Sequence, residues 1–135
     1  MKMTLTEILQ KQRILSTLAN MKLPYKLAYA ISKNLGKMEA EVKAIEETRL
    51  NIIKEYAVKD ENGEPVINDN VYDLGDNMEA FAEEFQNFLA TETEVDIFTV
   101  PEAVLGADDP RFDVLTVAQI VAIDFMIVEG GEKHE

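Results

Sequence analysis

Cysteine is absent from the 135 residues, and His134, near the end of the chain, is the only histidine. The chain therefore forms neither disulfide bonds nor thiolate metal sites, and its composition fits a reducing cytoplasm. Without a second histidine, Ser–His and Cys–His triads and histidine-based zinc sites are excluded as well. Gly-rich phosphate loops of the Walker or dinucleotide type are also missing. The sequence thus predicts no catalytic residue, no metal ligand and no bound cofactor.

Long apolar stretches are missing too. No apolar run approaches the ~20 residues that span a bilayer, and the first residues lack the apolar core of a signal peptide. Apolar residues nevertheless make up 47% of the chain, which is enough for it to fold. At this length we expect a single domain, residues 1–135, without membrane contact.

Basic residues are scarce in the second part of the chain. Residues 1–50 carry nine Lys/Arg and five Asp/Glu, whereas residues 51–135 carry four and twenty-one. The resulting charges of +4 and −17 add up to the −13 of the whole chain. The acidic half either meets a basic partner, imitates nucleic acid, or is a solvated surface. The lysines of the first half are scattered, without the aromatic interleaving that suggests base stacking, so we expect no direct binding to nucleic acid.

What the chain does contain is an unbroken 3–4 repeat of positions, apolar except at Arg49. The repeat places a narrow stripe along one helix, as in a coiled coil, and such a stripe requires a partner helix. The positions are Ala28, Ile31, Leu35, Met38, Val42, Ile45, Arg49, Ile52 and Tyr56. The predicted partner-binding residues within it are Leu35, Met38, Val42, Ile45, Arg49 and Ile52.

Pro24 suits the first turn of this helix, which should end at Tyr56 or Lys59. At 1.5 Å per residue the helix would be roughly 50 Å long, more than the width of a domain of this size. Part of it must project, bend back or pair with another chain. Gly36 is its weak point, because glycine is unfavourable in a helix interior and often ends one. Since the repeat continues through Gly36, we favour a continuous helix.

Two charged residues in apolar surroundings have alternative interpretations. Arg49 either extends its head out of the stripe, or fixes the register by meeting an acid across the helix pair. Asp124 lies either on the polar edge of an apolar helix or in a buried ion pair with a basic residue of the first half, of which Arg49 is one candidate. Residues 60–63 (DENG) resemble part of a calcium-binding loop. The position two residues before Asp60, where such a loop needs a ligand, is Val58, so we expect a turn instead.

Local signals divide the chain into a helical hairpin and an acidic part. Thr4 and Glu7 form a capping box, so a first helix should run to about Ala19 and pair with the long helix in residues 1–59. We expect residues 60–129 to form a small compact α+β part. Its expected elements are turns at 62–63 and 68–70, short strands at 65–67 and 71–74, a helix from the Asp76–Glu79 capping box to Ala90, a strand at 94–100, and a buried helix at 117–128 opened by Thr116 and Gln119.

The fold class predicted from these elements is α+β and mainly helical. One long helix belongs to the N-terminal hairpin, and a short β element with two further helices follows it. Gly130 and Gly131 end the last helix, and we expect residues 130–135, including His134, to form a flexible tail.

Several stretches taken together resemble a known family. They are residues 22–29 (KLPYKLAY), 49–64 (RLNIIKEYAVKDENGE), the acidic Phe-rich helix that ends near residue 90, 92–97 and 115–127. They are similar to a family of small proteins, a domain of unknown function, encoded by tailed bacteriophages and prophages of gut and Gram-positive bacteria. The resemblance covers most of the chain. It implies a viral origin, a location in the virion or the host cytoplasm and, loosely, a role near virion structure or assembly.

The leading hypothesis is a non-enzymatic bacteriophage protein that acts through protein–protein contacts, as a virion component, an assembly factor or an accessory protein. The alternative is a phage-encoded acidic inhibitor of a host defence system, whose acidic half blocks a nucleic-acid-binding groove. We expect the partner to be another phage protein or a second copy of the chain, in an oligomer or a larger assembly. Self-contacts should use the first half, because the −17 second half would repel itself.

Overall fold

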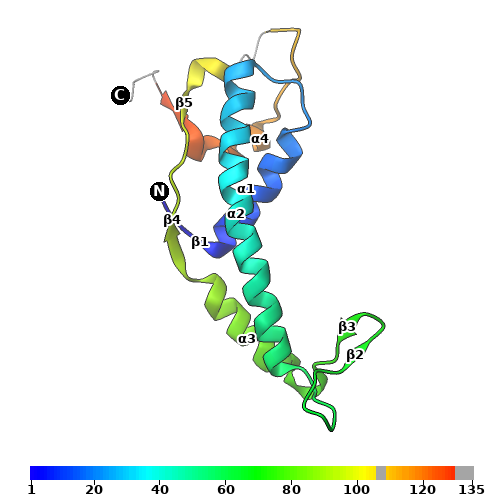
Figure 1. The fold of residues 1–135 in the computed structure, drawn as a ribbon. Coiled ribbons are helices and arrows are strands. Elements are labelled where there is room, and N and C mark those ends of the chain that lie inside the picture. The colour runs from blue at the N-terminus through cyan, green and yellow to red at the C-terminus, as the bar shows by residue number, and fades with distance from the viewer. Residues whose placement is uncertain (106–108, 130–135) are drawn as a thin grey trace.

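A computed structural model describes residues 1–105 and 109–129 as an elongated, mainly helical α+β fold (Figure 1). The helices in these ranges are α1 (Leu5–Leu18), α2 (Tyr25–Tyr56), α3 (Met78–Leu89) and α4 (Val117–Ala122). Short 3₁₀ turns lie at Gly75–Asn77, Glu102–Leu105 and Asp124–Met126. The strands are β1 (Lys2–Thr4), β2 (Ile67–Asn68), β3 (Val71–Tyr72), β4 (Glu92–Glu94), β5 (Val100–Pro101) and β6 (Ile127–Val128). The predicted fold class is confirmed.

The start of α1 follows the predicted capping box. The backbone N–H of Glu7 donates to the Thr4 hydroxyl at 3.1 Å, and the N–H of Thr4 donates to the Glu7 carboxylate at 2.8 Å. The first of these bonds satisfies a backbone donor that a helix start otherwise leaves without a partner. A second box, between Thr116 and Gln119, opens α4 in the same way. Both helix starts are therefore fixed by residues three positions apart in the sequence.

α2 runs without a break through Gly36 and spans almost the whole length of the molecule (Figure 1). A Cβ atom at Gly36 would meet no atom within 4 Å, so no neighbouring group requires glycine there. The favoured continuous helix is confirmed. Pro24 stands at the N-cap, one position before the predicted first turn. α1 packs beside the N-terminal half of α2 as the predicted hairpin, and α3 packs beside its C-terminal half.

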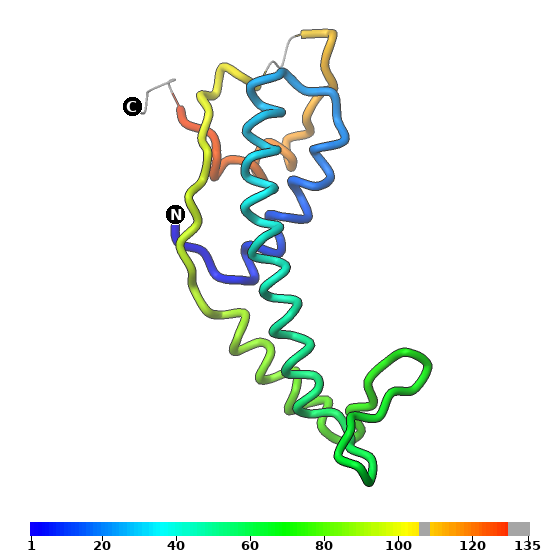
Figure 2. The backbone as a smooth tube through the Cα atoms, viewed as in Figure 1, coloured from blue at the N-terminus to red at the C-terminus, as the bar shows by residue number. Residues whose placement is uncertain are grey.

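Residues 90–105 form a return segment that runs back along α2 towards its N-terminal end (Figure 2). β4 in this segment pairs antiparallel with β1, and β5 pairs parallel with β6. Between β4 and β5, the fully buried side chain of Asn34 in α2 forms the backbone hydrogen bonds that a neighbouring strand would otherwise form. Its amide nitrogen donates to the carbonyl of Phe98 at 2.8 Å, and its amide oxygen accepts from the N–H of Phe98 at 2.7 Å.

The apolar core is divided unequally along α2. The larger cluster joins α1, the N-terminal half of α2 and the segments around β5 and β6. The smaller cluster lies at the C-terminal end of α2 and contains Ile53, Ala57 and Leu74, with three aromatic rings at its edge. Val95, Val100, Ile123 and Met126 belong to the larger cluster, so the last part of residues 60–129 shares a core with the helical hairpin.

Two predicted elements are wrong in the same way. Residues 94–100 are not one strand, because pairing with β1 ends where Glu94 lies opposite Lys2, and the side chain of Asn34 then binds the backbone of Phe98. The predicted helix at 117–128 ends after Ala122 and continues as a 3₁₀ turn. It then becomes β6, which pairs with β5. In both places a contact with a distant segment decides the backbone conformation.

The prediction of a capping box between Asp76 and Glu79 is also wrong. Residues 75–77 form a 3₁₀ turn, and Asn77 is the N-cap of α3 without a side-chain capping bond. The Asn77 amide instead donates to the carbonyl of Tyr56 at 2.8 Å, at the end of α2. The predicted turn at 68–70 joins two strands, now Ile67–Asn68 and Val71–Tyr72. The predicted tail, with His134, lies outside the described residues.

Candidate interaction surfaces

The predicted partner-binding stripe of α2 is largely covered by its own chain. Met38 and Ile45 are buried in the larger core cluster, where no partner can reach them. The other four residues of the set, Leu35, Val42, Arg49 and Ile52, are half-buried. The stripe therefore serves the packing of α2 within the chain, and the candidates for contact with a partner are other, exposed surfaces.

The buried stripe also departs from the 3–4 repeat beyond Ile45. The next fully packed position is Ile53, whereas Ile52 is only half-buried. Buried residues along α2 recur in eleven-residue steps, from Leu27 to Met38 and from Asn34 to Ile45. An eleven-residue step gives about 3.67 residues per turn, close to the 3.6 of a straight helix, whereas a heptad requires a left-handed supercoil. A packed globular helix therefore explains this surface better than a coiled coil.

Arg49 and Asp124 do not meet. The Arg49 guanidinium donates to Glu46 on its own helix, with Nη2 and Oε2 separated by 2.6 Å. This hydrogen bond lowers the pKa of Glu46 and raises the pKa of Arg49. Asp124 is exposed, which fits its interpretation as a polar edge and excludes the buried ion pair. Half-buried with its charged head at the surface, Arg49 matches the first of its two interpretations.

The α4 face is an exposed apolar surface formed by Val114, Val117, Ile120 and Val121. Val114, Val117 and Val121 are 77%, 78% and 67% exposed. Residues 114–123 carry no charged side chain. A groove of about 270 Å³ separates α4 from α1, lined by Ile14, Thr17, Leu18, Ala118, Gln119 and Ala122. The sequence predicted a buried helix here because apolar residues surround it, but nothing in the described part of the chain covers its outer face.

The aromatic groove lies at the N-terminal end of α2 and has a volume of about 400 Å³. Tyr25 and Tyr29, 86% and 55% exposed, form part of it. The ring of Tyr29 meets Phe98 edge-on, with centroids 5.5 Å apart. The Nζ of Lys33 lies 5.9 Å from the Tyr29 ring centroid. The groove is lined by Tyr25, Lys26, Tyr29, Phe98, Thr99 and Val100, with no acidic residue among them.

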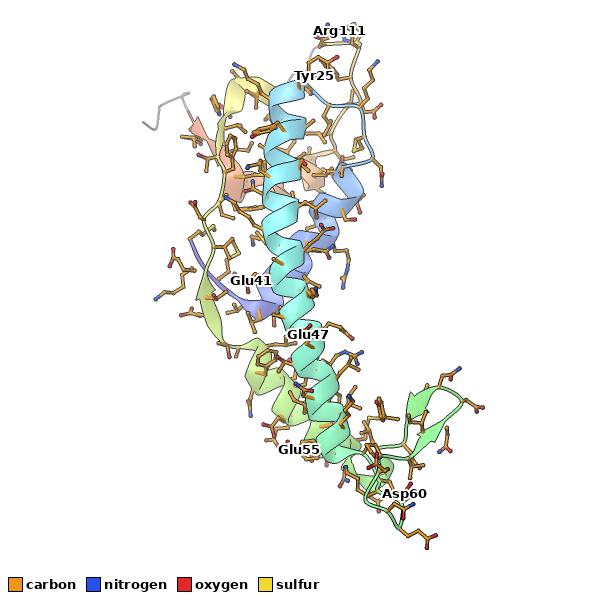
Figure 3. The ribbon with its side chains drawn as sticks, in the orientation of Figure 1. Tyr25, Glu41, Glu47, Glu55, Asp60 and Arg111 are labelled. Atoms are coloured by element: carbon orange, nitrogen blue, oxygen red, sulfur yellow. The ribbon has the colours of Figure 1, made fainter. Side chains whose placement is uncertain are left out.

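Arg111 lies at the same end as Tyr25, in a neighbouring groove of about 440 Å³ that Lys26 also lines (Figure 3). Its guanidinium is held by Asp109, with Nη2 and Oδ2 2.7 Å apart. This hydrogen bond lowers the pKa of Asp109 to about 2, so the pair stays charged at neutral pH. Within residues 1–105 and 109–129, Lys26 and Lys33 form no ion pair. These two lysines are therefore the uncompensated cations of the aromatic groove.

The opposite end of the molecule is acidic. Residues 60–89, from the end of α2 through α3, contain no Lys or Arg, and Figure 3 shows Glu55 and Asp60 at the end remote from Tyr25. Here residues 59–73 form the acidic hairpin, which includes β2 and β3 and projects from the body (Figure 1). Its turn residues Asp69 and Asn70 have φ values of 51° and 66°, typical of a tight type I′ turn.

Local hydrogen bonds shape the base of the acidic hairpin. Oδ1 of Asp60 accepts from the N–H groups of Asn62 and Glu64, at 2.8 and 3.0 Å. Residues 60–63, which resemble a calcium loop in sequence, thus form the expected turn. The ammonium group of Lys59 donates to carbonyl groups at the end of α2 rather than to an acid of the hairpin.

In the described ranges, no group of three or more His, Cys, Asp or Glu side chains is placed to hold a metal ion. No helix of these residues is both long and apolar enough to cross a membrane. The sequence identified the apolar character of α4 but missed the aromatic groove, which joins residues of α2 and the return segment. No family model, curated protein or solved structure matches the chain.

Proposed function

We propose that this chain is a non-enzymatic bacteriophage protein that acts through protein–protein contacts, as a virion component or an assembly or accessory protein. The observation that carries the contact function is the α4 face, where adjoining apolar side chains are largely exposed on a highly charged chain. Exposed apolar patches of this kind are typical of interaction sites. The phage origin rests on the resemblance of residues 22–29, 49–64 and 115–127 to a phage family.

The test replaces Val117 and Val121 together by Asp. It compares the amount of each phage protein that the variant and the wild type recover from infected cells. Two carboxylates on the α4 face would have to lose water on contact with an apolar partner, and this cost opposes binding. We expect recovery of the partner to fall at least about tenfold, which corresponds to about 1.4 kcal/mol. Met78→Asp is the matched control, because Met78 is 60% exposed on α3, away from α4.

Mass spectrometry of purified virions separates the structural role from the accessory role. Many copies per particle support a virion component, whereas absence from particles together with a phage partner in cells supports an assembly or accessory protein. Equal recovery of every phage protein by the wild type and the Val117→Asp/Val121→Asp variant would contradict the proposal.

A second candidate is a phage-encoded acidic inhibitor of a host nucleic-acid-binding protein. The observation in its favour is the run of residues 60–110, which lacks any basic side chain and includes the projecting acidic hairpin. Such a surface offers closely spaced negative charge to a basic groove. Competition between the protein and DNA for a basic host partner recovered from infected cells would favour this candidate over a virion component.

A further inference from the structure

The aromatic groove and the acidic hairpin are opposite in charge and are held apart by one helix. The aromatic groove lies at the first residues of α2, and the acidic hairpin follows its last residue (Figures 1 and 3). The 32 residues of α2 separate them by about 48 Å. One copy of the chain therefore cannot bring its own hairpin into its own groove.

The chemistry of the aromatic groove fits an acidic segment that also carries an apolar side chain. Tyr25, Tyr29 and Phe98 supply rigid aromatic surface, which is enriched in protein interfaces. Lys26 and Lys33 supply positive charge that no acid of the described residues neutralises by an ion pair. The volume of about 400 Å³ is in the range of pockets that enclose side chains or small ligands.

The acidic hairpin has these two properties. Ile67 and Val71, on opposite faces of its strands, are 54% and 65% exposed. Glu61, Glu64 and Asp69 surround them with exposed negative charge. The hairpin thus presents an apolar side chain on either face within an acidic rim. It is narrow and projects from the body, as a segment that enters a groove must (Figure 1).

We propose that the acidic hairpin of one copy binds in the aromatic groove of a second copy, so that molecules associate head to tail. This inference rests on the proposed function and names a partner for it, a second copy of this chain. Contacts between two grooves or between two hairpins would oppose like charges, whereas the head-to-tail contact pairs opposite ones. A head-to-tail contact is heterologous, so it forms a ring if the rotation closes and an open filament if it does not.

The first test reverses the charge of each end separately and then mixes the variants. Lys26→Glu/Lys33→Glu makes the groove acidic, and Glu61→Lys/Glu64→Lys changes the net charge of residues 59–73 from −4 to 0 while keeping the Asp60 side chain. We expect each variant alone to need at least about tenfold more protein to associate than the wild type, because its groove and its hairpin no longer carry opposite net charges. An equimolar mixture should associate again, since the unchanged acidic hairpin of the groove variant then meets the unchanged groove of the hairpin variant. Sedimentation velocity across protein concentration measures this.

Matched controls carry the same change of net charge at other exposed positions. Arg13→Glu/Lys43→Glu corresponds to the groove variant, and Glu39→Lys/Glu47→Lys corresponds to the hairpin variant. Both controls should associate as the wild type does. Wild-type behaviour of both end variants, or no recovery in the mixture, would overturn the head-to-tail contact.

The second test uses the absence of cysteine from the chain. Tyr25→Cys and Val71→Cys variants, mixed and treated with a short bis-maleimide, should give a cross-linked dimer that contains one copy of each. Predominant dimers within either variant alone would instead indicate like-to-like contacts and overturn the proposal. A wild type that stays monomeric at all concentrations would also overturn it. The proposed function would then still be decided by the α4 variants, which leave both ends unchanged.

Discussion

The two halves of α2 are anchored by different means. Its N-terminal half lies among α1, the return segment and the turn before β6, and buries Leu27, Ile31 and Met38 in the larger core. Its C-terminal half meets α3 and the base of the acidic hairpin; Ile45 still belongs to the larger core, and beyond it α2 contributes to the smaller cluster around Ile53. One continuous helix thus passes from a deep core to a shallow one.

Polar contacts replace apolar burial at the shallow end. Asn77 donates to the carbonyl of Tyr56, the Tyr56 hydroxyl donates to Glu84 at 2.7 Å, and Val58 and Asp73 are joined through their backbones. Each such bond at an exposed position adds about 0.5–1.5 kcal/mol or less, because water competes for both partners. The comparison therefore predicts a stable end and an end that opens more easily.

The largest expected effect comes from removing the same side chain at each end. Ile31→Ala leaves a cavity in the larger core and should lower the free energy of unfolding by about 4 kcal/mol. Ile53→Ala lies at the edge of the smaller cluster, where neighbours and water can fill the space, and should cost about 2 kcal/mol. Urea denaturation measures both, with the exposed Ile67→Ala as control. Equal losses for Ile31 and Ile53 would remove the distinction between the ends.

A somewhat smaller loss of folding stability is expected where Asn34 of α2 binds the return segment. Asn34→Leu keeps the volume but leaves the N–H and carbonyl of Phe98 without their buried partner, which should cost about 2–3 kcal/mol. Amide exchange should then accelerate in residues 95–99 before it accelerates in α1. Asn87→Leu, at an exposed position of α3, is the control and should change stability little. An unchanged exchange rate at Phe98 would show that the Asn34 amide does not hold this segment.

Two glycines sharpen the comparison by responding in opposite directions. Gly75 has φ +52°, and a Cβ there would lie 2.8 Å from Val58 Cγ2, so Gly75→Ala should cost about 1–2 kcal/mol at the shallow end. Gly36 is helical and has open space around it, so Gly36→Ala should stabilise the chain by about 0.5–1 kcal/mol. Thermal and urea unfolding measure both. A loss of stability in Gly36→Ala would indicate that another group packs closely against the Gly36 backbone.

The smallest effects concern pH, and the two ends should respond to opposite extremes. The Thr4 N–H bond lowers the pKa of Glu7 below its ordinary 4.5, so this stabilisation is present above that value and is lost as the pH falls. The hydrogen bond to Glu84 raises the pKa of Tyr56 above its ordinary 10.0. That stabilisation is present below pH 10 and is lost as the pH rises through the raised value.

The measurement compares urea midpoints of the wild type with Glu7→Gln and Tyr56→Phe. The difference between wild type and Glu7→Gln should change only in acid, because glutamine keeps the capping hydrogen bond without titrating. The difference between wild type and Tyr56→Phe should shrink only in alkali. A pH-independent difference in either case would mean that the bond is not maintained in solution.

Features set by neighbouring residues could be predicted from the sequence. The capping boxes at Thr4 and Thr116, the turn at 68–70 and the continuity of α2 all depend on residues a few positions apart. Segments 94–100 and 117–128 could not be predicted, because the parallel pairing of Val100 with Ile127 and the bonds from Asn34 decide their conformation. No local pattern specifies these distant contacts.

The candidate surfaces show the same limit. The apolar stripe of α2 and the apolar character of α4 were both visible in the sequence. Which of the two the chain covers depends on how α1 and the return segment pack. The structure buries Met38 and Ile45 and leaves Val117 and Val121 exposed, the reverse of the sequence-based expectation. A pattern indicates that a face needs apolar cover, but it does not say whether the same chain supplies it.

The length of α2 also limits which insertions and deletions the gene could tolerate. Each residue added within a helix turns everything beyond it by about 100° and shifts it by about 1.5 Å. One extra residue between Ile45 and Ile53 would therefore rotate the acidic hairpin by about a quarter of a circle relative to the aromatic groove. Seven extra residues would lengthen the helix by about 10.5 Å with only about 20° of rotation. Variants of this protein that differ in length should therefore change α2 by whole pairs of turns, with α3 and the return segment extended to match.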